Sequence, residues 1–129
     1  MPEVQSEEAS VIRVALPWPP RELSPNSRCH WAVKAKAAKK YKADAWALTR
    51  HAEPVYMPHT GPVQVSMTFH PPDERRRDWD NMLASTKNGI DGIAQALGID
   101  DSRFRLGMMV GDTVTHGLVE VRLSWSDDR

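Results

Sequence analysis

Residues 63–98 constrain the fold more than any other part of this chain of 129 residues. Apolar and polar side chains alternate over 63–69, which is the period-two pattern of a strand with one buried face. A double proline at 71 and 72 ends this strand, because proline has no backbone N–H to donate. Residues 80–97 then repeat apolar side chains with helical spacing, and Gly98 stands where glycine is favoured after a helix. The segment therefore predicts a strand followed by an amphipathic helix.

Four more segments have sequence patterns typical of strands or helices. Residues 11–16 predict a strand, and 107–115 and 118–125 predict two strands paired as a C-terminal hairpin. Residues 29–52 predict a helix. The apolar stripe expected to be buried along this helix consists of Trp31, Ala35, Ala38, Tyr41, Ala45, Leu48 and Ala52. The order β-α-β-α-β-β predicts a single α+β domain with a small mixed sheet packed against helices.

The length and composition fit one soluble domain. We expect residues 11–126 to form it, after a disordered N-terminal lead-in over 1–10. The single cysteine, Cys29, excludes a disulfide within the chain and is typical of a reducing, cytoplasmic environment. No apolar run approaches the roughly eighteen residues that a membrane-spanning helix needs.

Acidic and basic side chains balance in number but are segregated along the chain. There are 17 of each kind, so the formal net charge is zero. Between residues 28 and 50, one acid, Asp44, stands against the basic residues Arg28, Lys34, Lys36, Lys39, Lys40, Lys42 and Arg50. This basic helix face is either an ordinary solvated surface or a wall that faces phosphates, and the sequence leaves both readings open.

Charge is most concentrated directly after the double proline. The order there is Arg75, Arg76, Arg77, Asp78, Trp79, Asp80 and Asn81. One acid at this place is explained as the N-cap of the following helix. Two acids flanking Trp79, directly after three arginines, exceed what capping requires. The segment therefore suggests carboxylates placed beside phosphate-binding cations.

The expected helix carries further polar groups on one side. At 100° per residue, Asp80, Lys87 and Asp91 fall within a strip about 40° wide. The core face expected elsewhere on this helix consists of Met82, Thr86, Ile90, Ile93 and Leu97. Asp100 and Asp101 follow the helix, and they reach the same edge only if the chain after Gly98 folds back.

Carboxylates beside a lysine suit metal-dependent phosphodiester hydrolysis. Mg²⁺ prefers hard oxygen ligands and is held by a few carboxylates, water and substrate phosphate. An ammonium group stabilises the negative charge that develops on the reacting phosphate. The sequence lacks zinc-like spacing of histidines and cysteines, a phosphate-cradling glycine loop, and a recognisable serine or cysteine nucleophile with its base.

Four features, in this order, resemble the RusA family of Holliday junction resolvases: Leu16–Pro20, Arg76–Asn81, Lys87 with Asp91, and Asp100 with Asp101. The resemblance covers most of the chain. It implies a homodimeric, Mg²⁺-dependent endodeoxyribonuclease that nicks four-way DNA junctions symmetrically, with Mn²⁺ as a substitute metal. It also implies a role in DNA recombination and repair, and genes of this family are often carried by phages and prophages.

The resemblance assigns roles by position. It implies Asp78, Asp80 and Asp101 as metal ligands, Lys87 as the essential lysine, and Asp91 and Asp100 as supporting residues. It implies DNA contacts from Arg75, Arg76, Arg77, Lys34, Lys36, Lys39 and Lys40. One departure concerns the lysine, which in the best-known members occupies the position of Ala84. Here Lys87 lies one helical turn later.

Two alternative functions remain open. The chain could be a non-catalytic, basic nucleic-acid-binding module whose acids only cap a helix and balance its basic face. A metal-dependent transferase that holds a nucleotide–sugar diphosphate is the weaker alternative, because the chain is short for that function. We expect Trp79 to be a packed aromatic residue, with stacking on a base as the alternative.

Overall fold

The computed structural model describes residues 11–52 and 60–126, so the lead-in expected over 1–10 lies outside the described residues. The strands are β1 (Val11–Leu16), β2 (Val63–His70), β3 (Phe104–Val110) and β4 (Leu118–Trp125), and the helices are α2 (Trp31–His51), α3 (Trp79–Ser85) and α4 (Lys87–Leu97). Two short 3-10 helices are η1 (Arg21–Leu23) and η2 (Asp101–Arg103). None of the helices in these two ranges has both the length and the apolar character of a membrane span.

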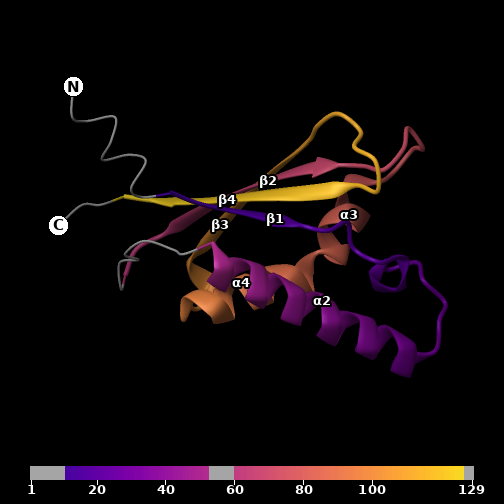
Figure 1. The fold of residues 1–129 in the computed structure, drawn as a ribbon, viewed down its shortest axis with the longest axis horizontal. Coiled ribbons are helices and arrows are strands. Elements are labelled where there is room, and N and C mark those ends of the chain that lie inside the picture. The colour runs from indigo at the N-terminus through magenta and orange to yellow at the C-terminus, as the bar shows by residue number, and fades with distance from the viewer. Residues whose placement is uncertain (1–10, 53–59, 127–129) are drawn as a thin grey trace.

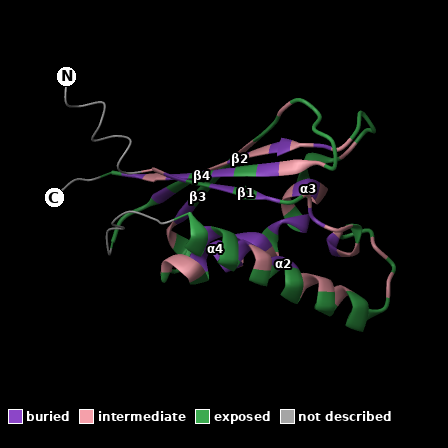
Figure 2. Ribbon diagram, viewed as in Figure 1, coloured by how far each residue is buried: buried purple, intermediate pink, exposed green. Residues whose placement is uncertain are grey.

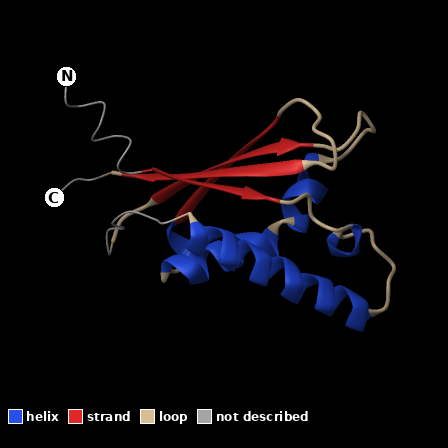
Figure 3. Ribbon diagram, in the orientation of Figure 1, coloured by secondary structure: helices blue, strands red, loops and turns tan. Residues whose placement is uncertain are grey.

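The four strands form one mixed sheet. Their order is β1-β4-β2-β3, in which β2 and β3 are parallel and the other neighbours are antiparallel. Figures 1 and 3 show the helices as a second layer on one side of this sheet. The predicted α+β fold with a small mixed sheet is therefore confirmed.

The core lies between the sheet and the helices. Along β2, Val63, Val65, Met67 and Phe69 are buried, as their alternation with polar residues predicts. β1 and β4 alternate in the same way, so buried and exposed bands follow one another along these strands (Figure 2). Removing these apolar side chains from water is the main favourable contribution to folding.

The predicted C-terminal hairpin is wrong. β3 ends at Val110 and pairs in parallel with β2, while β4 lies on the other side of β2. His116 and Gly117 have left-handed backbone, with φ of 69° and 76°, which is the local conformation of a tight hairpin turn. Here that turn only ends a longer connection over 111–117, and this connection lets the chain pass from one side of β2 to the other.

The helix predicted over residues 80–97 is divided at Thr86, where φ is −99° and ψ is 1°. The Thr86 hydroxyl donates to the Leu83 carbonyl, and the Ser85 hydroxyl donates to the Asn81 carbonyl, both at 2.8 Å. Such bonds to the preceding turn bend a helix. The single helix expected over residues 80–97 is therefore two shorter helices, α3 and α4. The residues expected on its core face are still buried or half-buried: Met82, Thr86, Ile90, Ile93 and Leu97.

The buried stripe predicted for α2 is only partly correct. Tyr41 and Ala45 are buried, but Trp31 is 75% exposed. Ala35, Leu48 and Ala52 are also exposed, and Ala38 is half-buried. The first turns of α2 extend beyond the sheet in Figure 1, so no layer covers them. The buried face is instead completed by Thr49, whose hydroxyl donates to the Ala45 carbonyl at 2.7 Å.

α4 packs closely against α2 at two glycines. A Cβ atom on Gly92 would clash with the Lys42 carbonyl oxygen, and one on Gly89 would lie 2.8 Å from the Tyr41 ring. Because Gly92 meets backbone rather than a movable side chain, a larger residue there would force the two helices apart. This contact fixes where α4, and the acids at its two ends, lie against the sheet.

We expect Gly92→Ala to lower the free energy of unfolding by about 1–3 kcal/mol, because overpacking outweighs the gain in helix propensity. The matched control is Gly107→Ala on β3, where an added Cβ would meet nothing within 4 Å. Urea denaturation measures both variants. A Gly92→Ala protein as stable as wild type would contradict the close contact.

Candidate functional site

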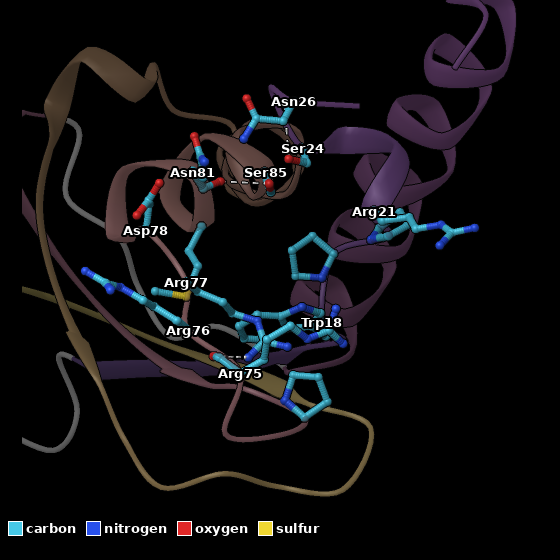
Figure 4. A pocket seen from close by; sticks show the side chains of 14 residues that line it. Trp18, Arg21, Ser24, Asn26, Arg75, Arg76, Arg77, Asp78, Asn81 and Ser85 are labelled. Atoms are coloured by element: carbon cyan, nitrogen blue, oxygen red, sulfur yellow. Dashed lines mark hydrogen bonds between the residues drawn. The ribbon is translucent and has the colours of Figure 1, made fainter. Parts of the chain in front are cut away.

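A pocket of about 740 Å³ opens where three segments meet. We call them the proline loop (residues 17–26), the arginine segment (residues 75–77) and α3. Asp78, at the start of α3, also lines this pocket. Figure 4 shows the arginine segment with Trp18 along one wall, and Ser24, Asn26, Asn81 and Ser85 along the other. The pocket therefore combines cations, uncharged polar groups and one carboxylate.

Trp18 holds the proline loop against the arginine segment. Its ring meets Phe69 edge to face, with the ring centres 6.1 Å apart, and the Arg77 guanidinium lies 5.6 Å from its centre. A Cβ atom on Gly117 would lie 2.7 Å from Trp18, so the 111–117 connection also packs on it. At the other side of the loop, the Tyr41 hydroxyl donates to the Pro17 carbonyl at 2.7 Å. The loop is thus fixed to the sheet and to α2.

Asp73 organises the arginine segment. Its carboxylate lies 3.2 Å from the Arg75 guanidinium and 3.0 Å from that of Arg77. Hydrogen bonds from Arg75, first its backbone N–H, lower the pKa of Asp73 to about 2, with Arg77 adding to the effect. Arg76 has no ion-pair partner in the part of the chain that the structure describes. Asp73 therefore holds two arginines in place. The guanidinium of Arg76, without a carboxylate partner among the described residues, is available to bind an anion.

His70, the last residue of β2, contacts the 111–117 connection and β4. One ring nitrogen lies 2.9 Å from the Asp112 carbonyl oxygen and the other 3.0 Å from a Glu120 carboxylate oxygen. Both neighbours are acceptors, so the doubly protonated ring satisfies both. The bond to the Asp112 carbonyl and then the bond to Glu120 raise the pKa of His70. The Val114 N–H also donates to the Pro71 carbonyl at 2.9 Å.

The two acids that flank Trp79 lie at the start of α3. Asp78 occupies the N-cap position, yet its side chain makes no capping hydrogen bond. The Asp80 carboxylate accepts from the Asn81 N–H at 2.9 Å. Both side chains are exposed. Capping therefore does not account for the Asp78 carboxylate, which is left at the pocket with its oxygens available to a cation.

Lys87 and Asp91 lie on α4, the helix that follows the two acids of α3. They lie one turn apart on α4, with Nζ 3.9 Å from the Asp91 carboxylate. No ion pair joins Lys87 to Asp78 or Asp80 within residues 11–52 and 60–126. The helix is interrupted at Thr86, between Asp80 and Lys87, so the single strip expected for Asp80, Lys87 and Asp91 stays a prediction.

Asp100 and Asp101 lie beyond the opposite end of α4 from Asp78. Gly98 ends the helix with φ of 70°, as predicted. The Asp100 carboxylate then accepts from the Ser102 N–H at 2.9 Å, and this bond lowers the pKa of Asp100. The eleven residues of α4 alone span about 16 Å. Figure 1 shows α3 and the end of α4 toward opposite ends of the sheet.

One chain therefore does not bring the predicted metal ligands together. Among the described residues, no group of three or more histidine, cysteine, aspartate or glutamate side chains is placed to hold a metal ion. Asp78 and Asp80 share the start of α3, whereas Asp101 lies with Asp100 beyond the far end of α4. The fold-back that would unite them within one chain does not occur.

The predicted DNA-binding cations are also divided. Arg75, Arg76 and Arg77 line the pocket, whereas the four lysines from α2 do not. Among those, Lys34 donates to the Ser24 carbonyl at 3.5 Å, and Lys40 pairs with Asp44 at 2.8 Å. Lys36 and Lys39 are exposed on α2.

The position of Trp79 contradicts the prediction that it is a packed aromatic residue. It is 63% exposed at the start of α3. This exposure is compatible with the alternative, stacking on a base.

Sequence reasoning missed the polar residues of the proline loop. Arg21, Ser24 and Asn26 line the pocket, but they lie about fifty residues before the acids. Leu16–Pro20 was part of the family resemblance, yet nothing in its pattern showed that the following turn would meet α3. Only the sheet order, which places β1 and β2 on either side of β4, brings the two segments together.

The fold and the pocket define an α+β protein with an arginine-lined cavity beside exposed carboxylates. No protein-family model matches the chain. A protein of Xylella fastidiosa (strain Temecula1), described as uncharacterized, is 42% identical over 105 residues, which are 80% of this chain and 69% of that protein. The chain therefore belongs to the same family as this Xylella protein. That description assigns no activity.

The His70 contacts predict a pH-dependent stability. The pKa of His70 is raised above its ordinary value of 6.5, so the stabilisation is complete below pH 6.5 and is lost as pH rises through the folded pKa. We expect the advantage of wild type over His70→Gln, measured by urea denaturation, to be larger at pH 6 than at pH 8.5. Glu120→Gln should reduce this pH dependence. An advantage that grows with pH would contradict the assignment.

Proposed function

We propose that the protein is a Mg²⁺-dependent endodeoxyribonuclease that resolves four-way DNA junctions by paired symmetric nicks. The observation that carries the proposal is the Asp78 carboxylate, which makes no capping hydrogen bond and lines the same pocket as three arginines. Cations able to bind a phosphodiester therefore lie around the same pocket as carboxylate oxygens able to bind a metal. The family resemblance of the sequence supplies the choice of substrate.

The acids of α3 fit Mg²⁺ chemically. This ion is commonly held by one or two carboxylates together with substrate phosphate and water, without a complete protein cage. Asp78 and Asp80 provide two exposed carboxylates of this kind. When bound, Mg²⁺ would supply Lewis-acid activation of water and of the phosphate; Mn²⁺ offers similar chemistry.

The remaining residues act by binding and neutralising charge. Arg75 and Arg77, held by Asp73, would fix the position of the DNA backbone, and Arg76 would bind a phosphate oxygen. Lys87 would offset the charge that develops as water attacks phosphorus and a P–O bond breaks. Asp91, 3.9 Å from Lys87 Nζ, would support this lysine, and Asp100 caps η2 beside Asp101. Lys34, Lys36, Lys39 and Lys40 would contact phosphates farther along the DNA.

A homodimer follows from the substrate and from the placement of the acids. Two strands cut across a two-fold junction need two equivalent sites. Because Asp101 lies beyond the far end of α4, its place in a metal site requires a second copy of the chain. The proposal therefore has Asp78 and Asp80 of one protomer joined by Asp101 of its partner.

The second candidate function is a basic nucleic-acid-binding module without catalysis. The observation that favours it is that no three-ligand group forms within the described residues. The same arginines and lysines would serve binding alone. A cleavage assay distinguishes this binding module from the proposed nuclease.

The test is incubation with a labelled synthetic four-way junction, with and without Mg²⁺. We expect symmetric nicking that Asp80→Asn reduces at least about 100-fold while junction binding is retained, because losing a metal ligand removes several kcal/mol of transition-state stabilisation. Asp112→Asn is the matched control, since Asp112 contacts His70 through its backbone oxygen. Binding without Mg²⁺-dependent nicking by the wild type would overturn the proposal in favour of the binding module.

A further inference from the structure

The two walls of the pocket differ in chemistry. One wall carries the arginine segment, of which Arg77 is only 18% exposed and lies over Trp18. The opposite wall carries the uncharged side chains Ser24, Asn26, Asn81 and Ser85, with the Asp78 carboxylate beside Asn81 at its edge (Figure 4). A site for phosphate alone would need only the first wall. The second wall offers donors and acceptors to something uncharged.

Two amides on the uncharged wall have open hydrogen-bonding capacity. Asn26 and Asn81 come from the proline loop and from α3, and neither side-chain amide has a hydrogen-bond partner in the described ranges. Their backbones are held in place: the Asn26 N–H donates to the Ser24 hydroxyl at 3.2 Å, and Asn81 lies within α3. An asparagine amide presents both a donor and an acceptor, the pairing that the edge of a nucleobase requires.

The space between the walls suits a ligand of nucleotide size. Its volume of about 740 Å³ lies within the usual range of small-molecule sites, about 300–1,000 Å³. Trp18, Pro19, Pro20, Pro72 and Met82 add flat or apolar surface to the lining. A nucleotide has the matching polarity, with an anionic phosphate at one end and an uncharged, hydrogen-bonding base at the other.

We propose that this pocket holds one unstacked nucleotide of the substrate, with its phosphate at the arginine segment and its base against the amides of Asn26 and Asn81. This inference rests on the proposed function and adds to it a means of reading base identity beside the cut. Enzymes that read a base outside the helical stack use hydrogen bonds to its edge together with contacts to its faces, and the cost is least where pairing is already interrupted. At a branch point the stacking of the bases is interrupted between neighbouring arms, although the bases stay paired, so part of this cost is already removed.

The test is a titration of the ¹⁵N-labelled full chain in EDTA, followed by NMR of the side-chain amides. The probes are dAMP, dCMP, dGMP and dTMP, with 2-deoxyribose 5-phosphate as the matched probe without a base. We expect at least one nucleotide to shift the Asn26 and Asn81 amide signals, while the base-free probe leaves them unchanged. The Asn88 amide, on α4 and outside the pocket lining, serves as the internal control.

Two variants test the assignment of the amides. Asn26→Ala and Asn81→Ala should each weaken binding of the preferred nucleotide roughly two- to tenfold, the worth of one net hydrogen bond, and leave binding of the base-free probe unchanged. Backbone NMR spectra confirm that each variant is folded. Equal affinity for nucleotides and for the base-free probe, or no shift at either amide, would overturn the inference.

The result of this nucleotide titration can be distinguished from the result of the junction-cleavage assay. Mg²⁺-dependent junction nicking without a base-dependent shift would contradict the proposed nucleotide pocket but support the proposed nuclease activity. A base-dependent shift without nicking would support the pocket and overturn the nuclease.

Discussion

The contact between α2 and α4 is the constraint on which the placement of the acids depends. Gly92 lets the two helices approach until an added methyl group would meet the α2 backbone. α4 is thereby held against the sheet with its two ends about 16 Å apart. Asp78 and Asp80 precede one end, and Asp101 follows the other. A metal site that uses all three acids therefore cannot close within one chain, and this is why the proposed enzyme is a dimer with shared sites.

The pocket depends on a second set of contacts, centred on Trp18. This ring packs against the sheet through Phe69, against Gly117, and under the Arg77 guanidinium. Asp73 neutralises part of the charge that would otherwise push the arginines apart. The result is a concentration of positive charge on a rigid support. Such preorganisation matters because mobile cations lose conformational entropy when they bind phosphate.

Much of the fold could be predicted from local patterns. The alternation along β2 and the glycine after α4 each identified an element correctly. Burial on one face of a strand favours alternating apolar residues, and left-handed backbone at a helix end favours glycine. The partner of β3 could not be predicted, since a tight turn at His116 and Gly117 is compatible with a hairpin and with a crossing connection. The break at Thr86 was missed because a threonine within an apolar repeat does not reveal that its hydroxyl will bond the preceding turn.

For the candidate site, the sequence predicted the residue types better than their arrangement. Two acids beside three arginines were sufficient to suggest phosphate chemistry, and the structure places those arginines and Asp78 around one pocket. The relation of Asp78 to Asp101 depends on tertiary structure, and the described residues of one chain do not bring these acids into one metal-binding group. The contribution of the proline loop likewise required the order of the strands.

The most direct measurement is the activity of a mixed dimer in which one protomer carries Asp80→Asn and the other carries Asp101→Asn. Purification with two different tags isolates this dimer, and a wild-type dimer with the same tags is the control. Shared sites leave one intact set of acids, so the mixed dimer should nick one strand of a four-way junction although each variant homodimer is inactive. An inactive mixed dimer beside an active tagged wild type would contradict the shared site and, with it, the role proposed for Asp101.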